Sequence, residues 1–318
     1  MNLLDRRIIF LMGKGGSGRT TLSAALAIAA ARQNRTALIL EAGDEDAVGP
    51  LFDTDSLERE PREIAPGIWG GRIDTRSVLT DYVHQFVGFP FVADTITRAE
   101  LFEHIADGTP GLRELMVLGQ IWRWEQEKMG SGYPKFDPII VDGPATGHGM
   151  SLLRQPRAVL DMFRVGPLAD QLRMVQEMLS DPGRSGVLLV TLPEELPINE
   201  AIDFIHAAEG DIQMAVTVTA VNGVYPTTFT AQDETRIREL LKKGDAVPDS
   251  LRPVLETARD QIFRRHLQEG YANRIRGENA GTVIEIPYVY SNRLFRDDIE
   301  GIADRLVQEL ELDTEAGK

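Results

Sequence analysis

The stretch that decides the fold of this chain reads Gly13-Lys14-Gly15-Gly16-Ser17-Gly18-Arg19-Thr20-Thr21. Gly13, Gly18 and Thr20 fit the phosphate-binding frame G-x-x-x-x-G-K-[ST], but Arg19 stands at the lysine position. An apolar run at 8–12 precedes the stretch, and a helix-like run at 22–29 follows it. Glycines allow backbone N–H groups to turn towards phosphate oxygens, and a helix N-terminus adds a favourable dipole. The order of strand, loop and helix predicts a nucleotide site in which Thr20 offers its hydroxyl to Mg²⁺; the alternative is a glycine-rich turn without a ligand.

Composition excludes several classes of site and partner. The 318 residues include no cysteine, so disulfides and thiolate metal sites are impossible. The net charge of −15 disfavours nucleic acid and anionic membrane surfaces as partners. No apolar segment reaches the length of a membrane span, and the N-terminus runs straight into a strand without a signal peptide. We therefore expect a cytoplasmic protein without stable membrane insertion.

Short apolar runs alternate with helical patterns, as in a doubly wound α/β fold with a mostly parallel sheet. We predict one domain over 1–318 with about seven strands. The expected strands lie at 7–12, 36–41, 68–74, 138–142, 187–191, 214–222 and 283–287. Between two of them, residues 76–135 read as a helical insertion; a closing helix is expected at 297–312, and 313–318 as a loose tail.

A second segment completes the predicted site. The apolar run 138–141 ends in Asp142, and Gly143-Pro144-Ala145-Thr146-Gly147-His148-Gly149 follows. An acid at the end of a core strand beside a phosphate loop typically serves Mg²⁺, commonly through water. Thr146 and the glycines behind the acid are suited to sense a γ-phosphate. The alternative is a solvated loop acid.

In these motifs, the chain resembles the MinD/ParA/ArsA class of nucleotide-binding proteins, whose deviant loop reads K-G-G-x-G-K-T-T. Thr146-Gly147-His148 after Asp142 resembles the D-x-A-P-T-G-H signature of the ArsA arsenite-pump and tail-anchored-protein targeting ATPases. Similar segments of bacterial ArsA-like proteins are met at 110–114, 192–200 and 286–293. The resemblance spans nearly the whole chain and implies a P-loop NTPase fold, bound ATP or ADP with Mg²⁺, and a dimer.

The resemblance also implies roles for single residues. Lys14 matches the signature lysine that reaches the partner's phosphates across a dimer interface, and Asp142 matches the Mg²⁺-associated acid. Thr146, Gly147 and His148 match the second switch. Asn222 matches an adenine-contacting Asn; otherwise it is a turn residue closing a strand.

Two departures from the family pattern bear on catalysis. Arg19 places a broad planar guanidinium where the family has the smaller ammonium of a lysine, in a narrow phosphate-binding loop. The family's D-x-D-P-A, whose second Asp orients the attacking water, is replaced by Glu41-Ala42-Gly43-Asp44-Glu45-Asp46. In an alignment that starts at Glu41, the position of the water-orienting Asp falls on Gly43. Asp44 can orient the water only if the loop shifts by one residue. Two readings stay open: an active Mg²⁺-dependent ATPase, or a slow or silent pseudo-ATPase that pairs with an active ArsA-like paralogue as a regulatory or structural subunit.

Partner classes follow from the same residues. Without cysteines, arsenite binding and a zinc-linked dimer are not expected, so a homodimer or heterodimer would rely on packing, the helical insertion and the Lys14 loops. A DNA-positioning ATPase of the ParA kind needs a basic surface, which the net charge argues against. Methionines at 150, 162, 174 and 178 suit a surface for hydrophobic protein clients, but the same spacing is typical of a buried helix face.

Overall fold

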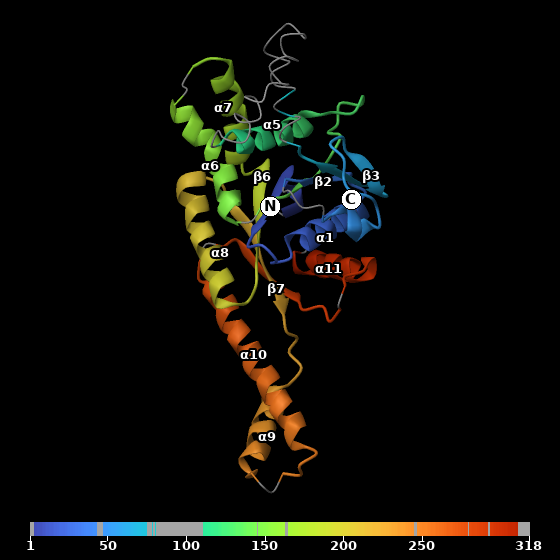
Figure 1. Cartoon of the computed structure of the whole chain (residues 1–318), viewed down its shortest axis with the longest axis vertical. Coiled ribbons are helices and arrows are strands. Elements are labelled where there is room, and N and C mark those ends of the chain that lie inside the picture. Colours follow the sequence, from blue (N-terminus) through green and yellow to red (C-terminus); the bar gives the residue numbers. More distant parts are fainter. Residues whose placement is uncertain are drawn as a thin grey trace, which may run out of the picture.

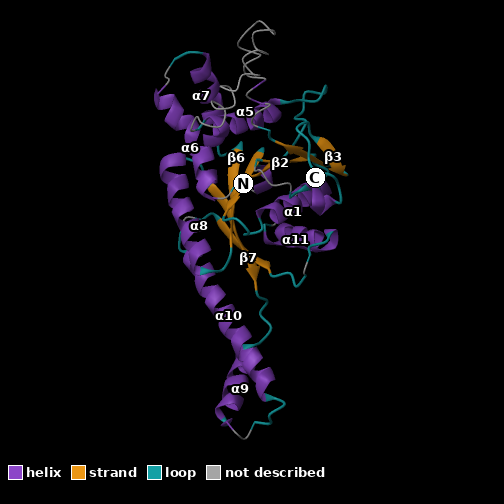
Figure 2. Cartoon of the chain, in the orientation of Figure 1, coloured by secondary structure: helices purple, strands orange, loops and turns teal. Residues whose placement is uncertain are grey.

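The fold is built on one sheet of eight strands in the order β3-β4-β2-β5-β1-β6-β7-β8. The computed structural model describes residues 3–42, 47–74, 78, 80, 111–144, 146–162, 165–244, 247–278, 280–291 and 293–310. The strands are β1 Ile8–Gly13, β2 Ala37–Glu41, β3 Arg62–Ala65, β4 Ile68–Arg72, β5 Ile139–Asp142, β6 Ser185–Thr191, β7 Val216–Val224 and β8 Thr282–Pro287. All neighbouring strands pair in parallel except β3 with β4. Figure 2 shows the strands of the sheet in orange.

The predicted doubly wound, mostly parallel sheet is confirmed, with one strand more than expected. The extra strand is β3, an antiparallel edge strand, which the sequence analysis missed. Its sequence Arg62-Glu63-Ile64-Ala65 is short and largely polar, and only Ala65 is buried. The central strands, by contrast, are buried along their whole length, which explains their continuous apolar runs.

Helices cover both faces of the sheet (Figure 1). α1 and α11 pack side by side on one face, and α5, α6, α7 and α8 cover the other. The helices are α1 Arg19–Arg32, α5 Leu112–Gln126, α6 Thr146–Met162, α7 Pro167–Ser180, α8 Glu195–Ala207, α9 Ala231–Lys242, α10 Arg252–Arg276 and α11 Arg296–Glu309. Short helical turns occur at Leu3–Asp5, Gly49–Phe52 and Ala208–Ile212.

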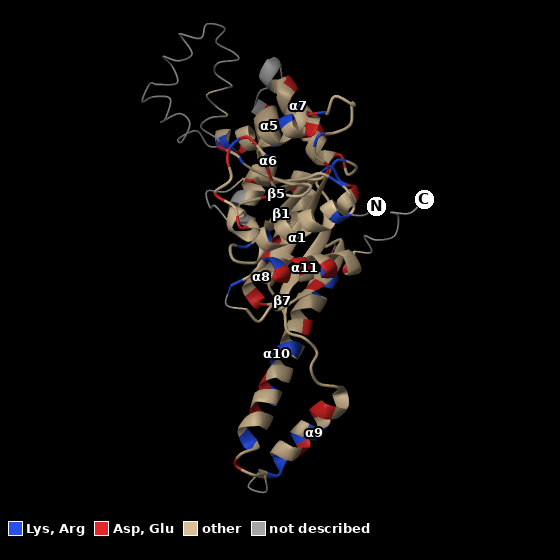
Figure 3. Ribbon diagram, turned by 90° about the vertical axis from the view of Figure 1, so that its right-hand side faces the viewer, with Lys and Arg blue, Asp and Glu red and all other residues tan. Residues whose placement is uncertain are grey.

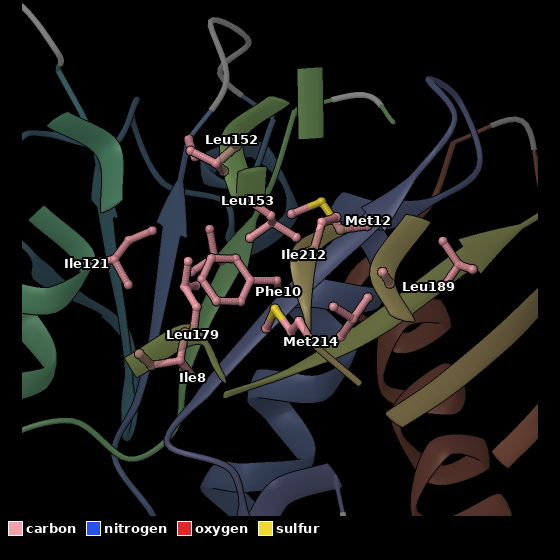
Figure 4. Packing of buried hydrophobic residues seen from close by; sticks show 14 of the residues in the cluster. Ile8, Phe10, Met12, Ile121, Leu152, Leu153, Leu179, Leu189, Ile212 and Met214 are labelled. Atoms are coloured by element: carbon pink, nitrogen blue, oxygen red, sulfur yellow. The ribbon is translucent and has the colours of Figure 1, made fainter. Parts of the chain in front are cut away.

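Alternate residues of β1 serve the two halves of the core. Ile9 and Leu11 face α1 and α11, whereas Ile8, Phe10 and Met12 face the other helical layer. Figure 4 shows Phe10 among side chains from several of these elements. Because β1 is central and fully covered, the loop that leaves it at Gly13 starts from a rigid platform.

The methionine-rich region 150–178 forms two helices, α6 and α7, whose apolar faces are mainly core. The buried side chains of this region include Leu152, Leu153, Leu172, Val175, Met178 and Leu179. Met174 is partly exposed at 38%, and Val165 between the helices is exposed at 86%. Of the predicted insertion 76–135, the structure describes α5 and the turn after it; most of 75–110 and the tail 313–318 lie outside the described residues.

Candidate functional site

The glycine-rich loop joins the carboxyl end of β1 to the N-terminus of α1, as predicted. Gly18 is the residue before α1 and adopts a left-handed conformation with φ of 96°, which favours glycine. A Cβ on Gly15 or Gly16 would meet open space in the described part of the chain, and both glycines are exposed. The first N–H groups of an α-helix have no acceptor one turn earlier in the helix, and α1 begins directly at the end of this loop. The loop therefore presents an open, amide-lined surface suited to an anion.

Thr20 and Asp142 meet at this loop. Asp142 is the last residue of β5, which pairs directly with β1, and only 8% of it is exposed. Thr20 donates its hydroxyl to Asp142 Oδ2 at 2.7 Å. The contact brings together two oxygen donors of the kind that Mg²⁺ prefers, from segments far apart in the sequence.

Arg19 lies against the segment that follows Asp142. Its guanidinium Nη1 donates a hydrogen bond to the backbone oxygen of Gly143. The positive charge at the lysine position of the motif is thus beside the loop but engaged with the end of β5. Thr146, Gly147 and His148 form the first turn of α6, and their side chains lie outside the described residues.

Lys14 forms an ion pair within the chain. Its ammonium lies 2.9 Å from Glu200 Oε1 on α8, and both side chains are about one-third exposed, at 35% and 34%. Glu200 belongs to the segment 192–200 that resembles ArsA-like proteins, for which the sequence analysis named no contact. Lys14 is therefore held by an acid of the same chain.

Asn222 contacts the loop from β7. Its side-chain Nδ2 donates to the backbone oxygen of Ser17 at 2.8 Å. The prediction that Asn222 closes its strand is wrong, because β7 continues to Val224. An added Cβ on Gly18 would collide with this amide, so a larger residue there would displace the Asn222 side chain in addition to straining the backbone.

Glu41 is a buried acid to which the sequence analysis gave no role beyond its alignment with the first Asp of D-x-D-P-A. It ends β2 directly opposite Asp142 of β5 and is 2% exposed. Its Oε1 accepts hydrogen bonds from the backbone N–H groups of Ala47 and Val48 at 2.9 and 2.7 Å. Glu41 thus joins the two ends of the segment that contains Asp44, which itself lies outside the described residues. An acid ending a buried strand was the same signal that identified Asp142.

No helix within the described ranges combines the length and the apolar character needed to cross a membrane.

Comparison with known proteins agrees with this geometry. Residues 6–166, which contain the loop, Asp142 and Thr146-Gly147-His148, match the family model described as anion-transporting ATPase. The chain is 29% identical over 257 residues to ATPase BagA of Mycobacterium tuberculosis, covering 79% of this chain and 74% of that protein. It is 22% identical to an arsenical pump-driving ATPase of Acidiphilium multivorum over 94% of this chain but only 54% of that protein. An arsenical pump-driving ATPase of Escherichia coli is 26% identical over 71% of this chain and 40% of its own length. Since the family model matches half of the chain and includes the loop 13–21 and Asp142, this chain belongs to the ArsA family of anion-transporting ATPases.

Proposed function

We propose that the chain binds ATP and Mg²⁺ at the loop 13–21 and hydrolyses the γ-phosphate, and that the nucleotide state controls its pairing with a second subunit. The observation that carries the proposal is the contact of Thr20 with Asp142 beside an exposed glycine loop. Membership of a family of ATPases supports the same activity.

The residues of the loop fit a magnesium nucleotide. Open space over Gly15 and Gly16 leaves room for a phosphate chain against the backbone, and a side chain there would fill it. Thr20 and Asp142 supply oxygen ligands, directly or through water. Bound Mg²⁺ supplies neutralisation of the charge that builds up on the transferred phosphoryl group.

Each site residue then has a proposed role. Thr20 and Asp142 hold the cation, while Arg19 and Lys14 stabilise negative charge on the phosphates. Asp44 orients the attacking water if its loop is shifted by one residue. The backbone amides of Gly13, Gly15, Gly16, Ser17, Gly18 and Thr21 bind phosphate oxygens. Thr146, Gly147 and His148 report on the γ-phosphate, and Asn222 contacts the adenine edge as well as the loop.

Lys14 gives the proposed coupling a physical basis. A lysine held by Glu200 cannot at the same time reach the phosphates of a neighbouring subunit. Nucleotide-dependent pairing at the loop, whether with a second copy or with an ArsA-like paralogue, requires Lys14 to exchange Glu200 for phosphate. The exchange is feasible because an ion pair this exposed contributes only about 0–1 kcal/mol.

The alternative function is a pseudo-ATPase subunit that binds nucleotide without turnover. The contact of Arg19 with the Gly143 oxygen favours it, since a guanidinium committed to backbone contributes less to a transferring phosphoryl group. Such a subunit would act through a paralogue, to which it could lend Lys14.

A hydrophobic protein client, if one is bound in this region, would contact α6 and α7 outside their buried faces. Among the described residues of that region, the exposed large apolar side chains are Val165 and Met174.

Phosphate release by the purified chain separates the two functions. Steady release that disappears in Asp142→Ala and Lys14→Ala, and persists in the control Asp161→Asn on the exposed side of α6, supports the ATPase. Nucleotide binding without phosphate release, at every concentration of the purified chain, supports the pseudo-ATPase. Absence of nucleotide binding would contradict both.

A further inference from the structure

A long helical arm is inserted between β7 and β8. α9 and α10 run away from the sheet, at the end of the molecule opposite to α5 and α7 (Figures 1 and 3). The C-terminal end of α10 is anchored in the body by the buried side chains Ala272 and Ile275, and its N-terminal half packs against α9. The proposed nucleotide site does not explain such an arm.

The inner face of α10 contacts the rest of the protein. Leu255 and Ala258 are buried, Arg265 binds Glu285 of β8, and Gln268 accepts a hydrogen bond from the backbone of Tyr225. These contacts fix α10 in one orientation relative to the body. The opposite face therefore points towards solvent, with Arg274 at its C-terminal end also donating to Asn199 of α8.

That opposite face carries a regular stripe. Its positions alternate in steps of four and three residues, the spacing of helices that pair along a seam. The stripe consists of Glu256, Asp260, Phe263, Leu267, Gly270 and Arg274, all of them exposed. Phe263 and Leu267 form its apolar centre, with exposed fractions of 66% and 48%. Two large apolar side chains on a rigid helix, in the middle of a polar stripe, are suited to contact a partner.

The stripe is complementary to itself when a second copy is turned end to end. In that register Phe263 of one copy faces Leu267 of the other, and Glu256 faces Arg274. Asp260 faces Gly270, where a Cβ would meet open space in the described part of the chain, so the backbones can approach. A parallel pairing would instead place Glu256 on Glu256 and Arg274 on Arg274. Like charges placed opposite each other are destabilising, so charge selects the antiparallel arrangement.

We propose that the outer face of α10 binds the same face of a second copy of this chain, antiparallel and about a two-fold axis near residue 265. The same patch serves both copies, as a closed two-fold interface requires. The paired stripe is ~27 Å long. A contact this small gives weak self-association, in about the micromolar range, that does not depend on nucleotide.

Sedimentation velocity of the nucleotide-free full chain, from about 1 to about 200 µM, tests the pairing. We expect a monomer–dimer equilibrium whose dissociation constant rises at least about tenfold in Phe263→Glu. Glu256→Arg and Arg274→Glu should each weaken it, and the double variant should restore it. Arg274 also donates to Asn199 Oδ1, so Asn199→Ala is the control that should leave the dissociation constant unchanged.

Cysteine cross-linking tests the direction of pairing, because the natural chain contains no cysteine. A mixture of the Glu256→Cys and Arg274→Cys chains should form a disulfide under mild oxidation, and neither chain should cross-link with itself. Cross-linking of each variant with itself would overturn the antiparallel arrangement. A chain that stays monomeric throughout the concentration range, with circular dichroism showing it folded, would overturn the proposal.

Discussion

The contact between Gly18 and Asn222 yields a quantitative prediction about the phosphate-binding loop. Alanine at Gly18 must adopt a φ near 96°, a left-handed conformation that costs about 1–2 kcal/mol. Its Cβ also displaces the Asn222 amide from the Ser17 oxygen, and a lost hydrogen bond of this kind costs about 1 kcal/mol. Gly18→Ala should therefore lower the free energy of unfolding by about 2–3 kcal/mol.

The double variant provides the test of this reasoning. Asn222→Ala alone should cost about 1 kcal/mol, because it removes the same hydrogen bond. The Gly18→Ala/Asn222→Ala chain loses that bond only once. Its loss of unfolding free energy should therefore be about 1 kcal/mol smaller than the sum of the losses in the two single variants. Urea unfolding of the four chains without nucleotide measures the coupling. Strict additivity would refute the idea that the Gly18 position and the Asn222 amide compete for one space.

Three further predictions concern charged groups. Glu200→Gln should leave the free energy of unfolding within about 1 kcal/mol of that of the natural chain, since the ion pair is exposed. The same substitution should increase ATP-dependent pairing, because it frees Lys14. Unchanged pairing would argue against Glu200 as the intramolecular partner of Lys14. Asp142→Asn should make ATP affinity nearly independent of Mg²⁺ concentration, measured by calorimetric titration, whereas a retained dependence would remove Asp142 from the cation site. Hydrogen bonding to Glu234 raises the pKa of His266 above 6.5, so its stabilisation of the arm is fully present below pH 6.5 and is lost as the pH rises through the raised pKa. Urea midpoints should therefore fall towards about pH 8 more in the natural chain than in His266→Gln, and parallel curves would contradict this assignment.

Much of the fold could be predicted because central parallel strands must be apolar on both faces. The strands β1, β5 and β6 appear in the sequence as short continuous runs and in the structure as buried strands. The edge strand β3 was missed because one solvated edge strand needs no such run. The arm was missed for a related reason, since α9 buries none of its residues and most of them are polar.

The site was predictable where topology alone brings residues together. The ends of neighbouring parallel strands meet at one edge of the sheet, so the loop after β1 and Asp142 after β5 had to be close. Glu41 was equally accessible to this argument, as the end of β2. The contact of Lys14 with Glu200 was not, because it depends on where α8 begins and which way its first turns face. The role of Asp44 stays a prediction, since it lies outside the described residues.

Calorimetric titration with ATP and Mg²⁺ tests the central claim most directly. We predict measurable heat of binding for the natural chain and a loss of affinity of at least about tenfold in Thr20→Val, which removes the hydroxyl that contacts Asp142. The control Thr235→Val, on the distant helix α9, should bind like the natural chain. Absence of heat in the natural chain, alone and when mixed with an ArsA-like paralogue, would contradict the assignment of the loop 13–21 as a nucleotide site.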